Sequence, residues 1–104
     1  MTILTSKPYT LSQIKRLKEL FEVYIKTVID IDKKLCVAGM DRHFEGEQIL
    51  LRGGSAQKDI WGGGIDINIR PNHNNLKNEI QSEEIKQKYR ILTEYFFRNL
   101  YDKN

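Results

Sequence analysis

The chain has 104 residues, of which 39% are hydrophobic and 30% are charged, with a formal net charge of +3. This length suits one domain, over residues 1–104, and the apolar content excludes a disordered or collagen-like chain. No apolar stretch reaches the roughly 18 to 20 residues that cross a bilayer, and the first residues carry no charged leader, so we expect a soluble, cytoplasmic protein with no membrane partner.

The first predicted elements are a short edge strand and an amphipathic helix. Residues 1–5 alternate weakly between apolar and polar, and Pro8 would end the strand that they form. Thr10 and Gln13 have the spacing of a capping box, which marks the start of a helix. Apolar residues then recur every three or four positions, so the pattern predicts a helix over about 11–23.

A β-hairpin is expected next. β-branched residues at every second position predict a strand over about 24–31, and the short apolar run 35–39 suits a hairpin partner. Cys36, the single cysteine, lies inside that run without a basic neighbour. We therefore expect a buried, unreactive thiol and no disulfide.

The middle of the chain is harder to interpret. Residues 41–51 fit a helix or a strand, and we favour a helix that ends at Gly53 or Gly54 as its left-handed cap. Residues 52–64 then read as a loop whose glycines supply turns with positive φ.

The last two predicted elements are a strand and a long helix. Isoleucine alternates with polar residues over 65–70, which predicts a strand with one apolar and one polar face. Ser82 can cap a helix over about 83–100. Together the elements predict an α+β fold: a single two-layer domain with a small, mostly antiparallel sheet of three or four strands and two longer helices, about 11–23 and 83–100, on one face.

Polar residues that could carry chemistry collect between residues 41 and 75, where loops are expected. His43 and Glu47 would share one face of a helix, a spacing that suits acid–base chemistry or two metal ligands. A third metal ligand is missing nearby and the glycine motifs of nucleotide sites are absent, so we predict no metal site and no cofactor. The candidates for catalysis are His43, Glu47 and Asp59, and those for ligand binding are Ser55, Gln57, Trp61, Asn68 and Arg70.

Two motifs carry a family resemblance. They are GSAQKDIWG at residues 54–62 and INIRP at residues 67–71. Over about residues 3–92 the chain resembles the DUF5674-type family of short uncharacterised prokaryotic proteins. The resemblance implies a shared fold and a shared polar surface, which the eight candidate residues above would form, but no known reaction.

Three functions are compatible with this pattern. The first is a pocket between residues 41–61 and the polar face of strand 65–70, in which Arg70 binds a small anionic ligand for recognition or for an unidentified reaction. The alternative is a structural or interaction protein that forms a homodimer through its aromatic C-terminal helix. Nucleic-acid binding is a weaker alternative, because basic residues such as Lys15 are interleaved with acidic residues such as Glu19.

Overall fold

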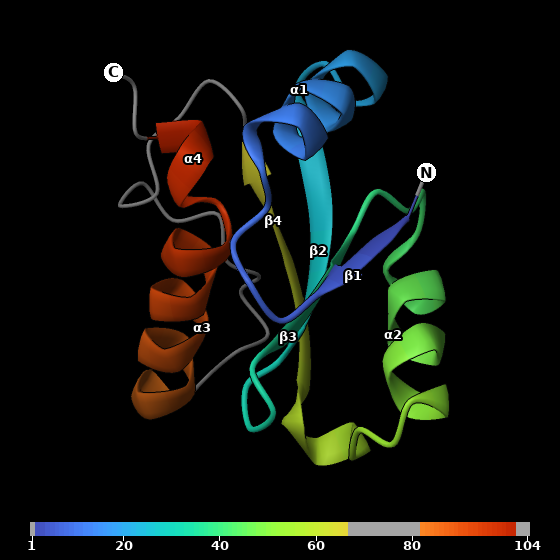
Figure 1. Cartoon of the computed structure of the whole chain (residues 1–104). Helices are drawn as coiled ribbons and strands as arrows, with labels where there is room; N and C mark the ends of the chain where they lie inside the picture. The colour runs from blue at the N-terminus through green and yellow to red at the C-terminus, as the bar shows by residue number, and fades with distance from the viewer. Residues whose placement is uncertain (1, 67–81, 102–104) are drawn as a thin grey trace.

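The computed structural model describes residues 2–66 and 82–101 (Figure 1). Four strands form one antiparallel sheet in the order β1-β3-β2-β4, and helices pack against it. The strands are β1 (Ile3–Thr5), β2 (Tyr24–Asp30), β3 (Leu35–Ala38) and β4 (Ile60–Asp66). The helices are α1 (Leu11–Leu20), α2 (His43–Arg52), the 3-10 turn η1 (Gln57–Asp59), α3 (Glu83–Phe96) and α4 (Arg98–Tyr101). The predicted α+β class is confirmed.

One face of the sheet is covered by α1 and α3 and holds the larger core. The isoleucines at alternate positions of β2 point into it, as period-2 alternation requires. The buried residues of this core are Tyr9, Ile14, Leu17, Ile25, Ile29, Cys36, Ala38, Ile65, Tyr89, Leu92, Phe96 and Phe97. The prediction that the two longer helices share one face is therefore confirmed.

The opposite face is covered by α2, so this helix adds a third layer to the two that the sequence predicts (Figure 1). Val28 and Leu50 belong to this smaller core. Gly46 lets the helix approach β2 closely, because a Cβ there would lie 2.9 Å from Val28 Cγ2 and 2.9 Å from Met40 Cε. The helical interpretation of residues 41–51 is confirmed.

Both long helices begin as predicted and end earlier. Thr10 Oγ1 accepts the Gln13 amide at 3.1 Å, and Gln13 Oε1 accepts the Thr10 amide at 2.9 Å, which completes the capping box. Helix α1 stops at Leu20 because Phe21 leaves helical geometry, with φ −126° and ψ 84°. In the same way α3 ends at Phe96, and a bend at Phe97 separates it from α4.

The predicted loop over residues 52–64 is wrong from Ile60 onward. Trp61 and the three glycines that follow it belong to β4 and pair with β2, Gly63 opposite Thr27. Positive φ among the described glycines occurs only at Gly39 and Gly54, so the glycine run makes no such turn. The first two residues of the predicted strand 65–70 lie in β4, and the other four lie outside the described residues.

Candidate functional site

The structure distributes the predicted site residues over several elements. His43 and Glu47 lie on α2, Ser55 lies in the loop after it, Gln57 and Asp59 lie in η1, and Trp61 lies in β4. Ser55 is buried, and its hydroxyl oxygen has no hydrogen-bond partner within the described residues. Asn68 and Arg70 lie outside the described residues.

Trp61 and His43 lie on opposite faces of β4. The Trp61 side chain packs against the larger core on the α1 and α3 side, and its Nε1 is buried without a partner in the described part of the chain. His43 reaches Gly62 and Gly63 from the α2 side. The two residues therefore do not form one pocket.

His43 is the candidate that makes the most specific contact. Its Nε2 lies 2.6 Å from the carbonyl oxygen of Gly63. A carbonyl oxygen can only accept a hydrogen bond, so Nε2 carries the hydrogen and donates it. Nδ1 is then the nitrogen of the neutral ring that can accept a proton, which makes it a base with a fixed tautomer.

The glycines of β4 make room for two rings on this face. A Cβ on Gly62 would lie 3.1 Å from His43 Cδ2, and a Cβ on Gly64 would overlap the ring of Tyr24. The polar residues on this face of the strands are Tyr24 and Lys26 of β2 and Asp66 of β4, with His43 of α2 against the glycines and Glu47 one helical turn beyond it. We call this group the glycine-strand site.

Charge and burial give the glycine-strand site a mixed character. Tyr24 pairs with Asp66 across the strands, and burial together with that negative charge raises the pKa of the Tyr24 hydroxyl, which stays a neutral donor. Lys26 Nζ lies 6.0 Å from the centre of the Tyr24 ring. The site thus combines a base, a hydroxyl donor, a cation and the Asp66 carboxylate, and Glu47 follows on the next turn of α2.

Tyr24, Lys26 and Asp66 were not predicted as site residues. Tyr24 and Lys26 occupy alternate positions of a predicted strand, opposite to its isoleucines, and this period-2 pattern was the available signal. What the pattern does not reveal is the neighbouring strand, because β4 was expected to begin after the glycines.

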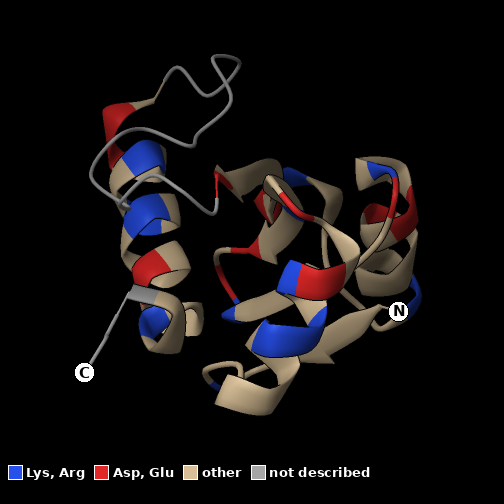
Figure 2. Cartoon of the chain, turned by 90° about the horizontal axis from the view of Figure 1, so that it is seen from above, with Lys and Arg blue, Asp and Glu red and all other residues tan. Residues whose placement is uncertain are grey.

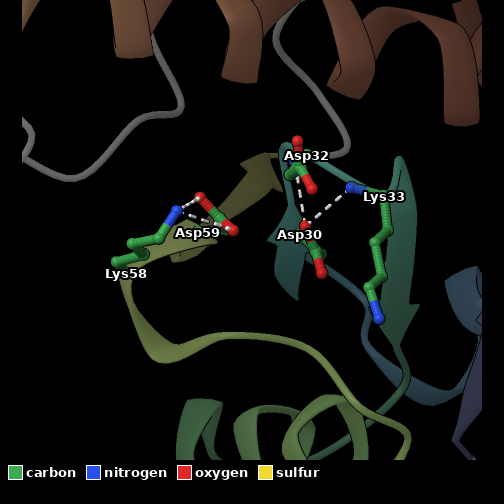
Figure 3. A network of polar contacts seen from close by, with 5 residues as sticks. All are labelled: Asp30, Asp32, Lys33, Lys58 and Asp59. Atoms are coloured by element: carbon green, nitrogen blue, oxygen red, sulfur yellow. Dashed lines mark hydrogen bonds and ion pairs between the residues drawn. The ribbon is translucent and has the colours of Figure 1, made fainter.

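A second polar cluster surrounds the turn between β2 and β3 (Figure 3). Asp30 Oδ1 accepts the amides of Asp32 and Lys33, each at 2.9 Å. Lys58 and Asp59 form an ion pair at 3.3 Å nearby, on the segment that leads into β4.

Two hydrogen bonds to backbone carbonyls attach residues 54–59 to this turn. Lys33 Nζ donates to the Gly54 carbonyl at 2.9 Å, and the Ile31 amide donates to the Asp59 carbonyl at 3.0 Å. These bonds give part of the GSAQKDIWG motif a structural role, because they hold residues 54–59 against the β2–β3 hairpin.

The described residues contain neither a cluster of metal ligands nor a membrane-spanning helix. Within residues 2–66 and 82–101, no group of three or more His, Cys, Asp or Glu side chains is placed to hold a metal ion. Over the same residues no helix combines the length and apolar character that crossing a bilayer requires.

Comparison with known proteins gives one family. The model of a family described as "Protein of unknown function (DUF5674)" matches residues 3–96. No curated protein and no solved structure matches the chain. The matched range runs from β1 to α3 and includes every candidate site residue.

Proposed function

The chain belongs to the DUF5674 family, whose model covers residues 3–96, and we propose that it is a small binding domain with its ligand at the glycine-strand site. The proposed ligand is a small organic anion that also bears hydroxyl or amine donors, and His43 exchanges a proton with it. The observation that carries this proposal is the 2.6 Å hydrogen bond from His43 to the Gly63 carbonyl, because it fixes the orientation of the ring and leaves Nδ1 as the base.

Several features support an anionic ligand group. Lys26 supplies a positive charge on the same face, and the amides at the start of α2, which carry partial positive charge, begin at His43. Arg70, the cation predicted to bind the anion, lies outside the described residues. The carboxylates of Glu47 and Asp66 favour hydrogen-bond donors elsewhere on the ligand.

Titration followed by backbone amide chemical shifts tests the proposal. Glucose 6-phosphate and citrate are the charged probes, and glucose is the uncharged control. We expect shifts at Lys26, His43 and Gly62–Gly64 with the charged probes only. His43→Ala and Lys26→Gln should each weaken binding about tenfold, about 1.4 kcal/mol, at an unchanged melting temperature.

Three outcomes would contradict the proposed function. They are equal affinity in wild type and His43→Ala, shifts confined to other surfaces, and no shift with either charged probe. Arg70→Ala tests separately the prediction that Arg70 binds the anion. It should weaken binding of glucose 6-phosphate without changing the hydrogen bond from His43 to the Gly63 carbonyl. Lys15→Gln on α1 is the matched control that removes one exposed lysine far from the site.

Self-association through α3 is the second candidate. Two of the aromatic residues expected to need a partner are covered, since Phe96 and Phe97 are fully buried in the core. What favours the dimer is the exposure of Ile91 and Tyr95, 61% and 41%, one turn apart on α3. Sedimentation showing only monomer at micromolar concentration would contradict it.

Nucleic-acid binding remains the weaker alternative. Along α3 the basic residues form a central run with acidic residues before and after it (Figure 2), so the positive charge of this helix is flanked by negative charge. A salt-dependent mobility shift with RNA or DNA would be needed to favour it.

A further inference from the structure

A cleft of about 720 Å³ lies between α3 and the turn that joins β2 to β3. It is on the α3 side of the sheet, whereas the glycine-strand site faces α2. Its volume is in the range of small-molecule pockets, roughly 300 to 1,000 Å³. The cleft is therefore a second candidate site, independent of the one proposed above.

The apolar part of the cleft comes mainly from α3. Ile91 and Tyr95 line it one helical turn apart and are 61% and 41% exposed. Leu92 and Ile31, which are more buried, lie beside them. An aliphatic or aromatic body placed here would remove two large apolar side chains from water.

Two lysines line the cleft from opposite sides. Lys34 comes from the β2–β3 turn and Lys88 comes from α3. Asp32 also lines it, so the three charged side chains sum to a positive charge. Lys88 has an ion pair with Glu84 at 3.6 Å, but both side chains are more than half exposed, so water screens that pair.

Lys34 has an unusual backbone for its residue type. Its φ is +60°, the left-handed region, and no other residue except glycine has positive φ in the described part of the chain. The turn requires this geometry, because the Lys34 amide donates back to the Asp30 carbonyl at 2.9 Å. Glycine adopts this conformation at lower cost, so a lysine at this position makes the turn less stable than a glycine would.

We propose that this cleft binds a small amphipathic carboxylate, with Lys34 and Lys88 at its anionic head and Ile91 and Tyr95 along its apolar body. Charge selects the occupant: an apolar ligand without an anionic group would leave both ammonium groups unused. A second copy of the chain is less suited, because its contact would have to cover both lysines.

Octanoate, octylammonium and octanol test the proposal, since they share one apolar body and differ in head charge. We expect octanoate to bind at least about fivefold more tightly than either of the others, with amide shifts at Lys34, Lys88 and Ile91. Equal affinity for octanoate and octylammonium would overturn the proposal.

The Lys34→Gly variant separates ligand binding from folding. It should raise the melting temperature while weakening octanoate binding about fivefold, a combination that a merely structural lysine would not give. Lys88→Gln should weaken binding without the gain in stability, and Lys18→Gln on α1 should do neither. Unchanged octanoate affinity in Lys34→Gly would overturn the assignment, and a lowered melting temperature would overturn the strain argument.

Two further measurements distinguish this site from the other proposals. His43→Ala should leave octanoate affinity unchanged. The proposal for the cleft therefore stands even if no ligand binds at the glycine-strand site. A dimer that dissociates on Ile91→Glu and excludes octanoate would assign this surface to a second copy of the chain and overturn the proposal.

Discussion

Tyr89 occupies the space that a side chain on Gly63 would need. A Cβ built on Gly63 would lie 2.5 Å from Tyr89 Oη, and the same hydroxyl hydrogen-bonds Thr27 Oγ1 at 2.8 Å. Thr27 is the partner of Gly63 across the strands, so the three residues form one buried unit that joins α3 to the sheet. Burial raises the pKa of the Tyr89 hydroxyl, which keeps it a neutral hydrogen-bonding group.

Gly63→Ala should therefore be far more destabilising than Gly62→Ala. At position 63 the methyl group meets a fully buried ring, and overpacking of this kind costs about 3 kcal/mol. At position 62 it meets His43 at 3.1 Å, and this ring is only partly buried and can shift, so we expect less than about 1 kcal/mol. Urea unfolding of both variants measures the difference, and equal losses would contradict this account.

Local patterns were enough to predict most of the fold. The capping box at Thr10 and the apolar spacing after it locate α1, and alternation of β-branched residues locates β2. These signals lie within a few residues of the structure that they specify, which is why a single sequence reveals them. The helix ends were predicted less well, because a bend such as that at Phe97 depends on its packing against Tyr9, 4.9 Å away between ring centres.

Gly62–Gly64 were wrongly predicted to form turns, because their role depends on residues that are distant in sequence. Gly62 and Gly64 leave space for His43 and Tyr24, which are distant in sequence. Consecutive glycines favour turns when judged by conformational freedom alone. Their pairing with β2 overrides that preference, and it could not be predicted without the register. The same long-range pairing adds Tyr24 to the candidate site and places Trp61 on the other face.

Asp30 offers a test of the polar turn. It is fully buried, its Oδ1 accepts the amides of Asp32 and Lys33, and its Oδ2 has no partner among the described residues. Asp30→Asn keeps the accepting oxygen but places an amide nitrogen where Oδ2 has no partner, so we expect a loss of about 1 kcal/mol. Asp30→Ala leaves both amides without this acceptor and should cost about 2 kcal/mol. If urea midpoints show equal losses for both variants, the charge itself is required.

Stability should fall in alkaline solution. Burial raises the pKa of the Cys36 thiol from 9.0 to about 12, and it also raises the pKa of the hydroxyls of Tyr9 and Tyr89. The unfolded chain then releases these protons at lower pH than the folded chain does. The stability contributed by the neutral thiol is complete below about pH 9 and decreases as the pH rises from 9 toward 12.

Cys36→Ala isolates the contribution of the thiol. The variant should lose stability less steeply over that pH range, by up to about 1.4 kcal/mol per pH unit. Urea unfolding at a series of alkaline pH values gives both slopes. Parallel slopes for the two proteins would show that the folded state does not hold the thiol proton.

The tautomer of His43 can be measured directly by ¹⁵N NMR at a pH where the ring is neutral. The 2.6 Å contact with the Gly63 carbonyl predicts a protonated Nε2 and an unprotonated Nδ1. Gly62→Ala should displace the ring, because its methyl group would lie 3.1 Å from Cδ2, and should give a mixture of tautomers at nearly unchanged stability. Binding of glucose 6-phosphate should weaken in the same variant, since the base is no longer held in place. A wild-type ring that carries its hydrogen on Nδ1 would remove both the contact and the role assigned to Nδ1 as the proton acceptor.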